Sequence, residues 1–101
     1  MHYPDFRLDG RTALVTGASK GIGWDLAKAL ADAGAAVAVA ARDRGALEQL
    51  ADEIRTDGGQ ALAVELDVRD VGQMGDVFGN VREHFGSLDV LVNNAGLGAN
   101  H

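Results

Sequence analysis

The chain has 101 residues, of which 47% are hydrophobic, and it carries a formal net charge of −6 and no cysteine. This length fits a single domain over residues 1–101, the cysteine count excludes a disulfide framework and a thiolate metal site, and the acidic balance argues against a nucleic-acid partner. No apolar stretch is long enough to span a membrane and the first ten residues lack the apolar core of a secretory signal, so we expect a cytoplasmic protein with no membrane partner.

Strands and helices alternate regularly after a loose N-terminal arm expected over residues 1–10. Short continuous apolar runs indicate strands buried on both faces, and apolar residues at helical spacing indicate helices that end near glycines. In chain order, the expected elements are a strand over 12–15, a helix over 22–33, a strand over 37–40, a helix over 47–54, a strand over 61–66, a helix over 71–85 and a strand over 88–92.

This alternation predicts parallel strands joined by right-handed crossovers. We therefore expect an α/β fold, a Rossmann-like doubly wound parallel sheet of about four strands in the order 3-2-1-4, with the first two helices on one face and the third on the other. The third helix contains Gly72, Gly75 and Gly79. Each costs about 1 kcal/mol relative to alanine inside a helix, so this helix should be the least stable, unless close packing against a neighbour requires the glycines.

The stretch TGASKGIG, residues 16–23, lies where the first strand leads into the first helix. In a doubly wound sheet this turn lies beside the point where strand order reverses, which is where such sheets bind ligands. A helix amino end offers N–H groups and a positive dipole to a phosphate, and glycines allow close approach. The spacing of Gly17, Gly21 and Gly23 is not that of a P-loop. The alternative is a tight turn and helix start with no ligand.

Two further motifs follow in order, LDV at 66–68 and NNAG at 93–96. Together with TGASKGIG they make the chain resemble the short-chain dehydrogenases/reductases over nearly its whole length. A different doubly wound protein, such as a methyltransferase, fits less well because LDV and NNAG argue against it. The resemblance implies a cofactor-binding fold for NAD(P) and an oxidoreductase that transfers hydride between the cofactor and a carbonyl or alcohol.

The resemblance also implies roles for individual residues. The cofactor's pyrophosphate and nearby ribose would lie against Gly17, Ser19, Lys20, Gly21, Ile22 and Gly23. Asp67 would accept a hydrogen bond from the adenine amino group, and Val68 would meet the ring through its backbone. Asn93, Asn94, Ala95 and Gly96 would end the fourth strand beside the adenine ribose, with Asn94 holding strand ends together.

Plainer alternatives exist for two of these motifs. Asp67 would otherwise be a loop acid or the cap of the third helix, although Asp70 is better placed as the cap. The NNAG motif would otherwise be a simple turn. Trp24 falls beside the apolar stripe of the first helix, which predicts a rim or partner contact.

The end of the second strand bears on the choice between NADP(H) and NAD(H). The sequence there is Ala40-Ala41-Arg42-Asp43, and Lys20 adds a second cation at the same rim. A 2′-phosphate favours a cation such as Arg42, so the resemblance is to NADP-preferring members, with NAD(H) also possible. Arg42 is otherwise a solvated surface residue, and Asp43 either contacts a ribose or starts the second helix.

The catalytic residues that the resemblance implies have no counterpart here. In that family a Tyr with a Lys four residues later, a Ser and an Asn lie beyond the NNAG motif, whereas the only tyrosine here, Tyr3, is followed four residues later by Arg7. We assign no catalytic residue and no metal ligand, and we expect a truncated, cofactor-binding half that is inactive alone. The alternative is a stand-alone nucleotide-binding or self-assembling module without hydride chemistry. An exposed edge over 88–94 and a half-covered apolar face predict self-association.

Overall fold

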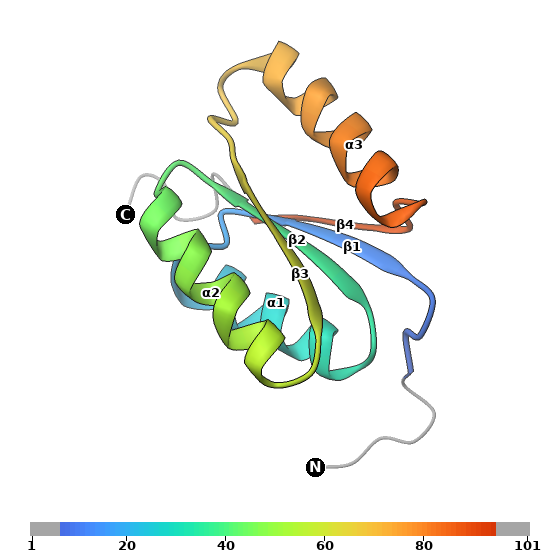
Figure 1. Cartoon of the computed structure of the whole chain (residues 1–101). Helices are drawn as coiled ribbons and strands as arrows, with labels where there is room; N and C mark the ends of the chain where they lie inside the picture. Colours follow the sequence, from blue (N-terminus) through green and yellow to red (C-terminus); the bar gives the residue numbers. More distant parts are fainter. Residues whose placement is uncertain (1–6, 95–101) are drawn as a thin grey trace.

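The structure, a computed structural model, describes residues 7–94 and leaves 1–6 and 95–101 undescribed (Figure 1). Its elements are β1 (Thr12–Thr16), α1 (Gly21–Asp32), β2 (Ala36–Ala41), α2 (Arg44–Thr56), β3 (Gln60–Glu65), α3 (Val71–Phe85) and β4 (Val90–Asn93). Every predicted element is present in the predicted order, with bounds that differ by a few residues.

The four strands are parallel and lie in the order β3-β2-β1-β4, which confirms the predicted doubly wound topology. The last strand begins at Val90 and not at Leu88 as predicted. Asp89 explains the difference, because its carboxylate accepts hydrogen bonds from the Thr12 N–H at 2.8 Å and the Ser87 hydroxyl at 3.0 Å. These contacts join the entry of β4 to the start of β1 before the strand pairing begins.

Helices α1 and α2 cover one face of the sheet and α3 covers the other (Figure 1). The first face packs Val15, Val37 and Val39 against Leu47 and Leu50 of α2. The second packs Leu14 and Ala38 against Val77 and Val81 of α3. Alanines alternate with valines in β2, so Val37 and Val39 pack on the α1 and α2 side and the smaller Ala38 and Ala40 pack on the α3 side.

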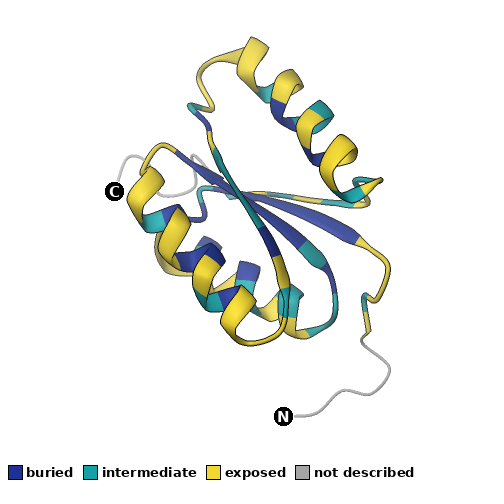
Figure 2. Cartoon of the chain, viewed as in Figure 1, coloured by how far each residue is buried: buried dark blue, intermediate teal, exposed yellow. Residues whose placement is uncertain are grey.

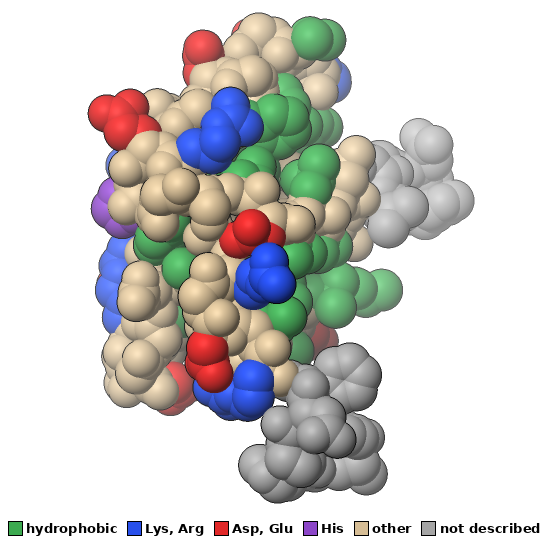
Figure 3. Space-filling model, turned by 90° about the vertical axis from the view of Figure 1, so that its right-hand side faces the viewer, with side chains coloured by type: hydrophobic (Ala, Val, Ile, Leu, Met, Phe, Trp, Pro, Cys, Tyr) green, Lys and Arg blue, Asp and Glu red, His purple; other side chains and the backbone are tan. Residues whose placement is uncertain are grey.

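Burial falls off from the centre of the sheet toward β4 (Figure 2). Every residue of β1 is buried, whereas β4 alternates between half-buried and exposed residues, and Leu91 is 50% exposed. Among residues 7–94 the exposed large apolar residues are Ile22, Leu26, Val68, Val71 and Leu91. Figure 3 shows hydrophobic side chains gathered along one side of the surface and not spread evenly.

Three smaller expectations have mixed outcomes. The described part of the arm is attached to the domain, because the Leu8 N–H donates to the Ala33 carbonyl at 2.7 Å. Trp24 is half-buried against the core and not only a rim residue. A Cβ at Gly75 or Gly79 would meet no atom within 4 Å, so no neighbour within residues 7–94 requires glycine there.

None of the helices in the described range combines the length and the apolar character needed to cross a membrane.

Candidate functional site

The four strands are parallel, so the segments that follow β1, β2 and β3 and the end of β4 lie at the same, carboxyl edge of the sheet. Backbone hydrogen bonds join them, from the Ala18 N–H to the Ala40 carbonyl at 3.2 Å and from the Leu66 N–H to the Ala41 carbonyl at 2.9 Å. The glycine turn, the end of β2, the LDV segment and the end of β4 therefore lie along one edge. The structure brings together the four segments that carry the residues singled out in the sequence.

Two glycines of the turn adopt backbone conformations that other residues avoid. Gly17 has φ +64° and Gly21 has φ +61°, both in the left-handed region. A third, Gly23, is needed for packing, since a Cβ there would collide with the Gly17 carbonyl oxygen and lie 2.6 Å from Nδ2 of Asn94. The absence of this Cβ lets α1 approach the turn and the end of β4 closely.

The amino end of α1 differs from those of α2 and α3. Asp43 caps α2 by accepting from the Ala46 N–H at 3.1 Å, and Asp70 caps α3 by accepting from the Gln73 N–H at 3.2 Å. The N-cap residue of α1 is the exposed Lys20, which makes no side-chain cap hydrogen bond. Helix α1 therefore starts without the carboxylate that completes the other two helices.

This arrangement fits a phosphate group. The first N–H groups of a helix have no partner within the helix, and the helix dipole makes this end positive. A Cβ added at Gly21 would meet nothing within 4 Å, so the turn leaves open space beside these donors. Ser19 is half-buried in the turn, and Ile22, at the start of α1, is 70% exposed. The turn thus combines backbone N–H donors, open space for a ligand and the positive charge of Lys20.

Two asparagines connect the end of β4 to β1 and to the glycine turn. The buried Thr16 hydroxyl donates to Oδ1 of Asn93 at 3.0 Å, and Nδ2 of Asn94 donates to the Gly17 carbonyl at 3.1 Å. Asn94 thus makes a link between strand ends of the kind expected for it. Ala95 and Gly96, the rest of the NNAG motif, lie outside the described residues.

The carboxylate of Asp67 accepts hydrogen bonds from a neighbouring residue, Arg69. Its Oδ1 accepts from the Arg69 N–H and Nε, each at 3.0 Å, and its Oδ2 accepts from Arg69 Nη2 at 2.8 Å. These hydrogen bonds, with a smaller contribution from the charge of Arg42, hold the pKa of Asp67 far below its usual range. Asp70 is the cap of α3, as expected. Val68, next in the chain, is 37% exposed.

Sequence reasoning missed Arg69. Its position in the sequence could have indicated this contact, because an arginine two residues after Asp67 can reach back and donate two hydrogen bonds to the same carboxylate.

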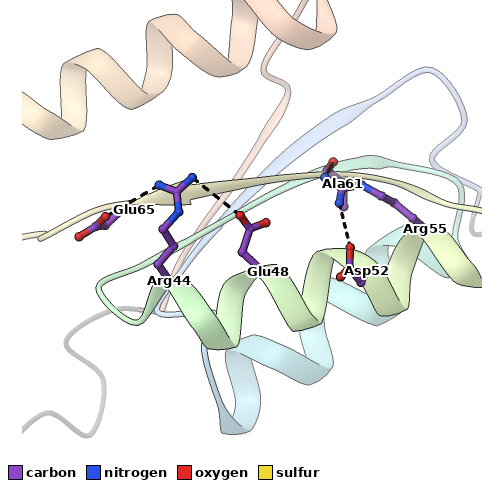
Figure 4. A network of polar contacts seen from close by, with 6 residues as sticks. All are labelled: Arg44, Glu48, Asp52, Arg55, Ala61 and Glu65. Atoms are coloured by element: carbon purple, nitrogen blue, oxygen red, sulfur yellow. Dashed lines mark hydrogen bonds and ion pairs between the residues drawn. The ribbon is translucent and has the colours of Figure 1, made fainter.

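The end of β2 leaves one arginine without an ionic partner among residues 7–94. Arg44 pairs with Glu48 at 3.7 Å and with Glu65 at 3.9 Å, as Figure 4 shows, whereas no ion pair involves the exposed Arg42 in that range. Asp43 starts α2 through its cap hydrogen bond. Of the two roles considered for Asp43, the structure shows the cap.

A cavity of about 360 Å³ lies at the opposite edge of the sheet, away from the residues discussed above. Its lining includes Arg7, Lys28, Asp57 and Gly59, which come from the arm and from the carboxyl ends of α1 and α2. At the carboxyl edge, the candidate site is an open rim formed by the glycine turn, the ends of β2 and β4, and the LDV segment.

Comparison with known proteins gives a consistent result. The model of the short chain dehydrogenase family matches residues 11–101. Versicolorin reductase stcU of Emericella nidulans is 44% identical over 94 residues, which cover 92% of this chain and 36% of that protein. The chain therefore spans about a third of the length of the curated relatives it matches.

Solved structures agree with the sequence matches. A hydroxysteroid dehydrogenase from Escherichia coli superimposes with a TM-score of 0.90 at 39% identity, covering 94% of this chain and 40% of that one. A metagenomic short-chain oxidoreductase in complex with NADP superimposes with a TM-score of 0.84 at 40% identity, covering 89% of this chain and 41% of that one.

Proposed function

This chain belongs to the short chain dehydrogenase family, and from that premise we propose that it is the cofactor-binding half of an NADP(H)-dependent oxidoreductase. The observation that carries the proposal is the uncapped amino end of α1, next to the Gly17–Gly23 turn and within the region that the family model matches. When bound, the nicotinamide of such a cofactor supplies hydride to a carbonyl or accepts it from an alcohol.

The proposed pyrophosphate site is the glycine turn. Backbone N–H groups at the start of α1 donate to phosphate oxygens, and Lys20 adds a positive charge. Gly23 keeps the helix close to the turn, and Asn94 holds the turn against β4. The roles of Ser19 and Ile22 follow from their positions in the turn and in the first residues of α1.

The proposed adenosine site is the rim formed by the LDV segment and the end of β4. Asp67 accepts from the adenine amino group and the backbone of Val68 contacts the ring, while Asn93 to Gly96 lie beside the ribose. The hydrogen bond from the Leu66 N–H to the Ala41 carbonyl supports the first part of this site, because it brings the LDV segment beside the end of β2, while the end of β4 lies on the other side of β1 at the same edge.

The preference for NADP(H) over NAD(H) rests on charge at the end of β2. Arg42 is exposed, and its charge reaches Asp67 across the rim. The nearest acid in sequence, Asp43, caps α2 by accepting from the Ala46 N–H, so its carboxylate has a structural role beside any contact to a ribose. A guanidinium that makes no ion pair in the described range suits a 2′-phosphate.

Calorimetric titration of the chain with NADPH, NADH and adenosine 2′,5′-bisphosphate tests the proposal. We expect NADPH to bind at least about tenfold more tightly than NADH, and Arg42→Ala to remove most of that difference. Arg44→Ala is the matched control, since Arg44 already pairs with two glutamates. Failure of all three ligands to bind would contradict a cofactor module, and tighter binding of NADH would contradict the role of Arg42.

We also propose that these 101 residues alone do not transfer hydride, because the family's Tyr-x-x-x-Lys pair has no counterpart among them. A binding module without hydride chemistry is the second candidate, favoured by the same observation. A carbonyl-reductase assay with NADPH tests the first statement. If the coding frame continues past His101 with a Ser and a Tyr-x-x-x-Lys pair, that continuation supports the oxidoreductase.

Self-association through β4 is a further proposal. The strand is at the edge of the sheet, and its residue Leu91 is half-exposed. An open apolar edge strand can pair with a second chain. Sedimentation at micromolar concentration is expected to show a dimer or larger species, and a clean monomer would contradict the proposal.

A further inference from the structure

The backbone of Asp67 is held on both sides by the loop that leads into α3. Its N–H donates to Oε1 of Gln73 at 3.0 Å, and its carbonyl accepts from the Asp70 N–H at 2.9 Å. The Gln73 N–H in turn donates to the capping carboxylate of Asp70 at 3.2 Å. These bonds tie Asp67 to the first turn of α3, so only rotation of its side chain remains to be restrained.

Arg69 restrains that side chain. The guanidinium forks onto both carboxylate oxygens, and the Arg69 N–H adds a third hydrogen bond. A carboxylate has about four acceptor positions, so this arrangement leaves one position, on Oδ2, for another donor. The Asp67 side chain is 31% exposed, and a ligand at the rim can therefore reach it.

We propose that Arg69 is a positioning residue for base recognition: it fixes the Asp67 carboxylate with a single acceptor free, so that the rim selects a purine with a 6-amino group over one with a 6-oxo group. This inference rests on the proposed function, in which Asp67 meets the adenine. The amino group donates to the free acceptor, whereas a 6-oxo oxygen would face a carboxylate without a hydrogen between them.

The geometry makes Arg69 a good residue to test. Its side chain is 75% exposed, and each of its hydrogen bonds within residues 7–94 goes to Asp67. Replacing it leaves the backbone bonds of Gln73 and Asp70 to Asp67 in place, so the loop should keep its course. The effect of the substitution on the position of the Asp67 carboxylate can thus be measured separately from any effect on the fold.

The experiment compares calorimetric affinities for NADPH and for its hypoxanthine analogue, in which the 6-amino group is a 6-oxo group. The variants are Arg69→Ala, Arg69→Lys and, as a matched control, Arg82→Ala, which removes an exposed arginine from α3. We expect Arg69→Ala to reduce the preference for the adenine form by up to about fivefold, the scale on which an exposed ion pair acts. Arg69→Lys should restore part of the preference and Arg82→Ala should keep all of it.

A second readout follows the carboxylate itself. NMR titration of the Asp67 carboxyl carbon should show its pKa rising toward the ordinary range in Arg69→Ala and unchanged in Arg82→Ala. An unchanged adenine preference in Arg69→Ala, or a larger one, would overturn the inference while the proposed function stands. Equal binding of both dinucleotides by the parent chain would do the same, and binding of neither would overturn both.

Discussion

The amino ends of the three helices follow two different designs. Helices α2 and α3 each begin with an aspartate whose carboxylate accepts from the third residue of the helix, Ala46 or Gln73. Helix α1 has Lys20 as its N-cap, between two glycines in left-handed conformations, Gly17 and Gly21, and Lys20 makes no side-chain cap hydrogen bond. A helix without a side-chain cap leaves the N–H groups at its amino end available for a ligand. The absence of such a locally stabilising contact is expected at functional sites.

The largest effect should come from filling the space that brings α1 to the turn. Gly23→Ala introduces a Cβ that meets the Gly17 carbonyl and the Asn94 amide. We expect a loss of about 1–3 kcal/mol in the free energy of unfolding, the usual cost of overpacking, together with loss of NADPH binding. Urea denaturation measures the first effect. Gly75→Ala is the control, since a Cβ there meets nothing and should stabilise α3 by up to about 1 kcal/mol.

A substitution at the N-cap of α1 can supply the carboxylate cap that this helix lacks. Lys20→Asp places a carboxylate at the N-cap and should raise the free energy of unfolding by about 1 kcal/mol in the absence of ligand. The same carboxylate would occupy donors and repel phosphate, so NADPH affinity should fall by about tenfold or more. Thermal melting tests the predicted gain in stability, and calorimetry tests the predicted loss of NADPH affinity. A variant that binds NADPH as well as the parent would show that the end of α1 is not the phosphate site.

Removing an existing cap should affect stability without the same effect on phosphate binding. Asp43→Ala leaves the Ala46 N–H without its acceptor, and we expect the free energy of unfolding to fall by about 1 kcal/mol. Denaturation by urea, with adenosine 5′-diphosphate affinity as the companion measurement, checks the prediction. A loss of diphosphate affinity comparable to that of Lys20→Asp would contradict the distinction between α1 and α2.

The smallest effect concerns the pH dependence of stability that arises from Asp67, in the loop before α3. Because Arg69 lowers the pKa of Asp67 in the folded chain, the ionised carboxylate stabilises the fold above the unfolded-state pKa of about 3.9. That contribution is lost as the pH falls below this value toward the depressed pKa. As the pH is lowered from 5 toward acid unfolding, the free energy of unfolding should therefore fall less steeply for Arg69→Ala than for Arg82→Ala. Identical slopes for the two variants would contradict this prediction.

Much of this arrangement could be predicted from the sequence because it depends on periodicity. Continuous apolar runs alternating with helical spacing imply a parallel doubly wound sheet, and that topology places the ends of all the strands on one edge. The segments containing Gly17, Asp67 and Asn94 could thus be grouped before any coordinates. The capping roles of Asp43 and Asp70 follow from local position, although the role of Asp43 stayed open because an acid there also suits a ribose.

Features that depend on the course of a loop could not be predicted. Whether Arg69 folds back onto Asp67 depends on the turn that follows β3, which periodicity does not describe. The late start of β4 depends on Asp89 reaching Thr12 across the sheet, a contact between residues far apart in the sequence. Trp24 lies beside the apolar stripe, and its burial is decided by how α1 lies against the sheet.

Titration of the isotopically labelled chain with NADPH, followed by amide NMR shifts, shows whether the amino end of α1 is the phosphate site. We expect the largest shifts at the N–H groups of Gly21, Ile22 and Gly23, with little change at the capped ends around Ala46 and Gln73. Shifts confined to the cavity near Lys28 and Gly59 at the opposite edge, or equal shifts at all three helix starts, would contradict this expectation.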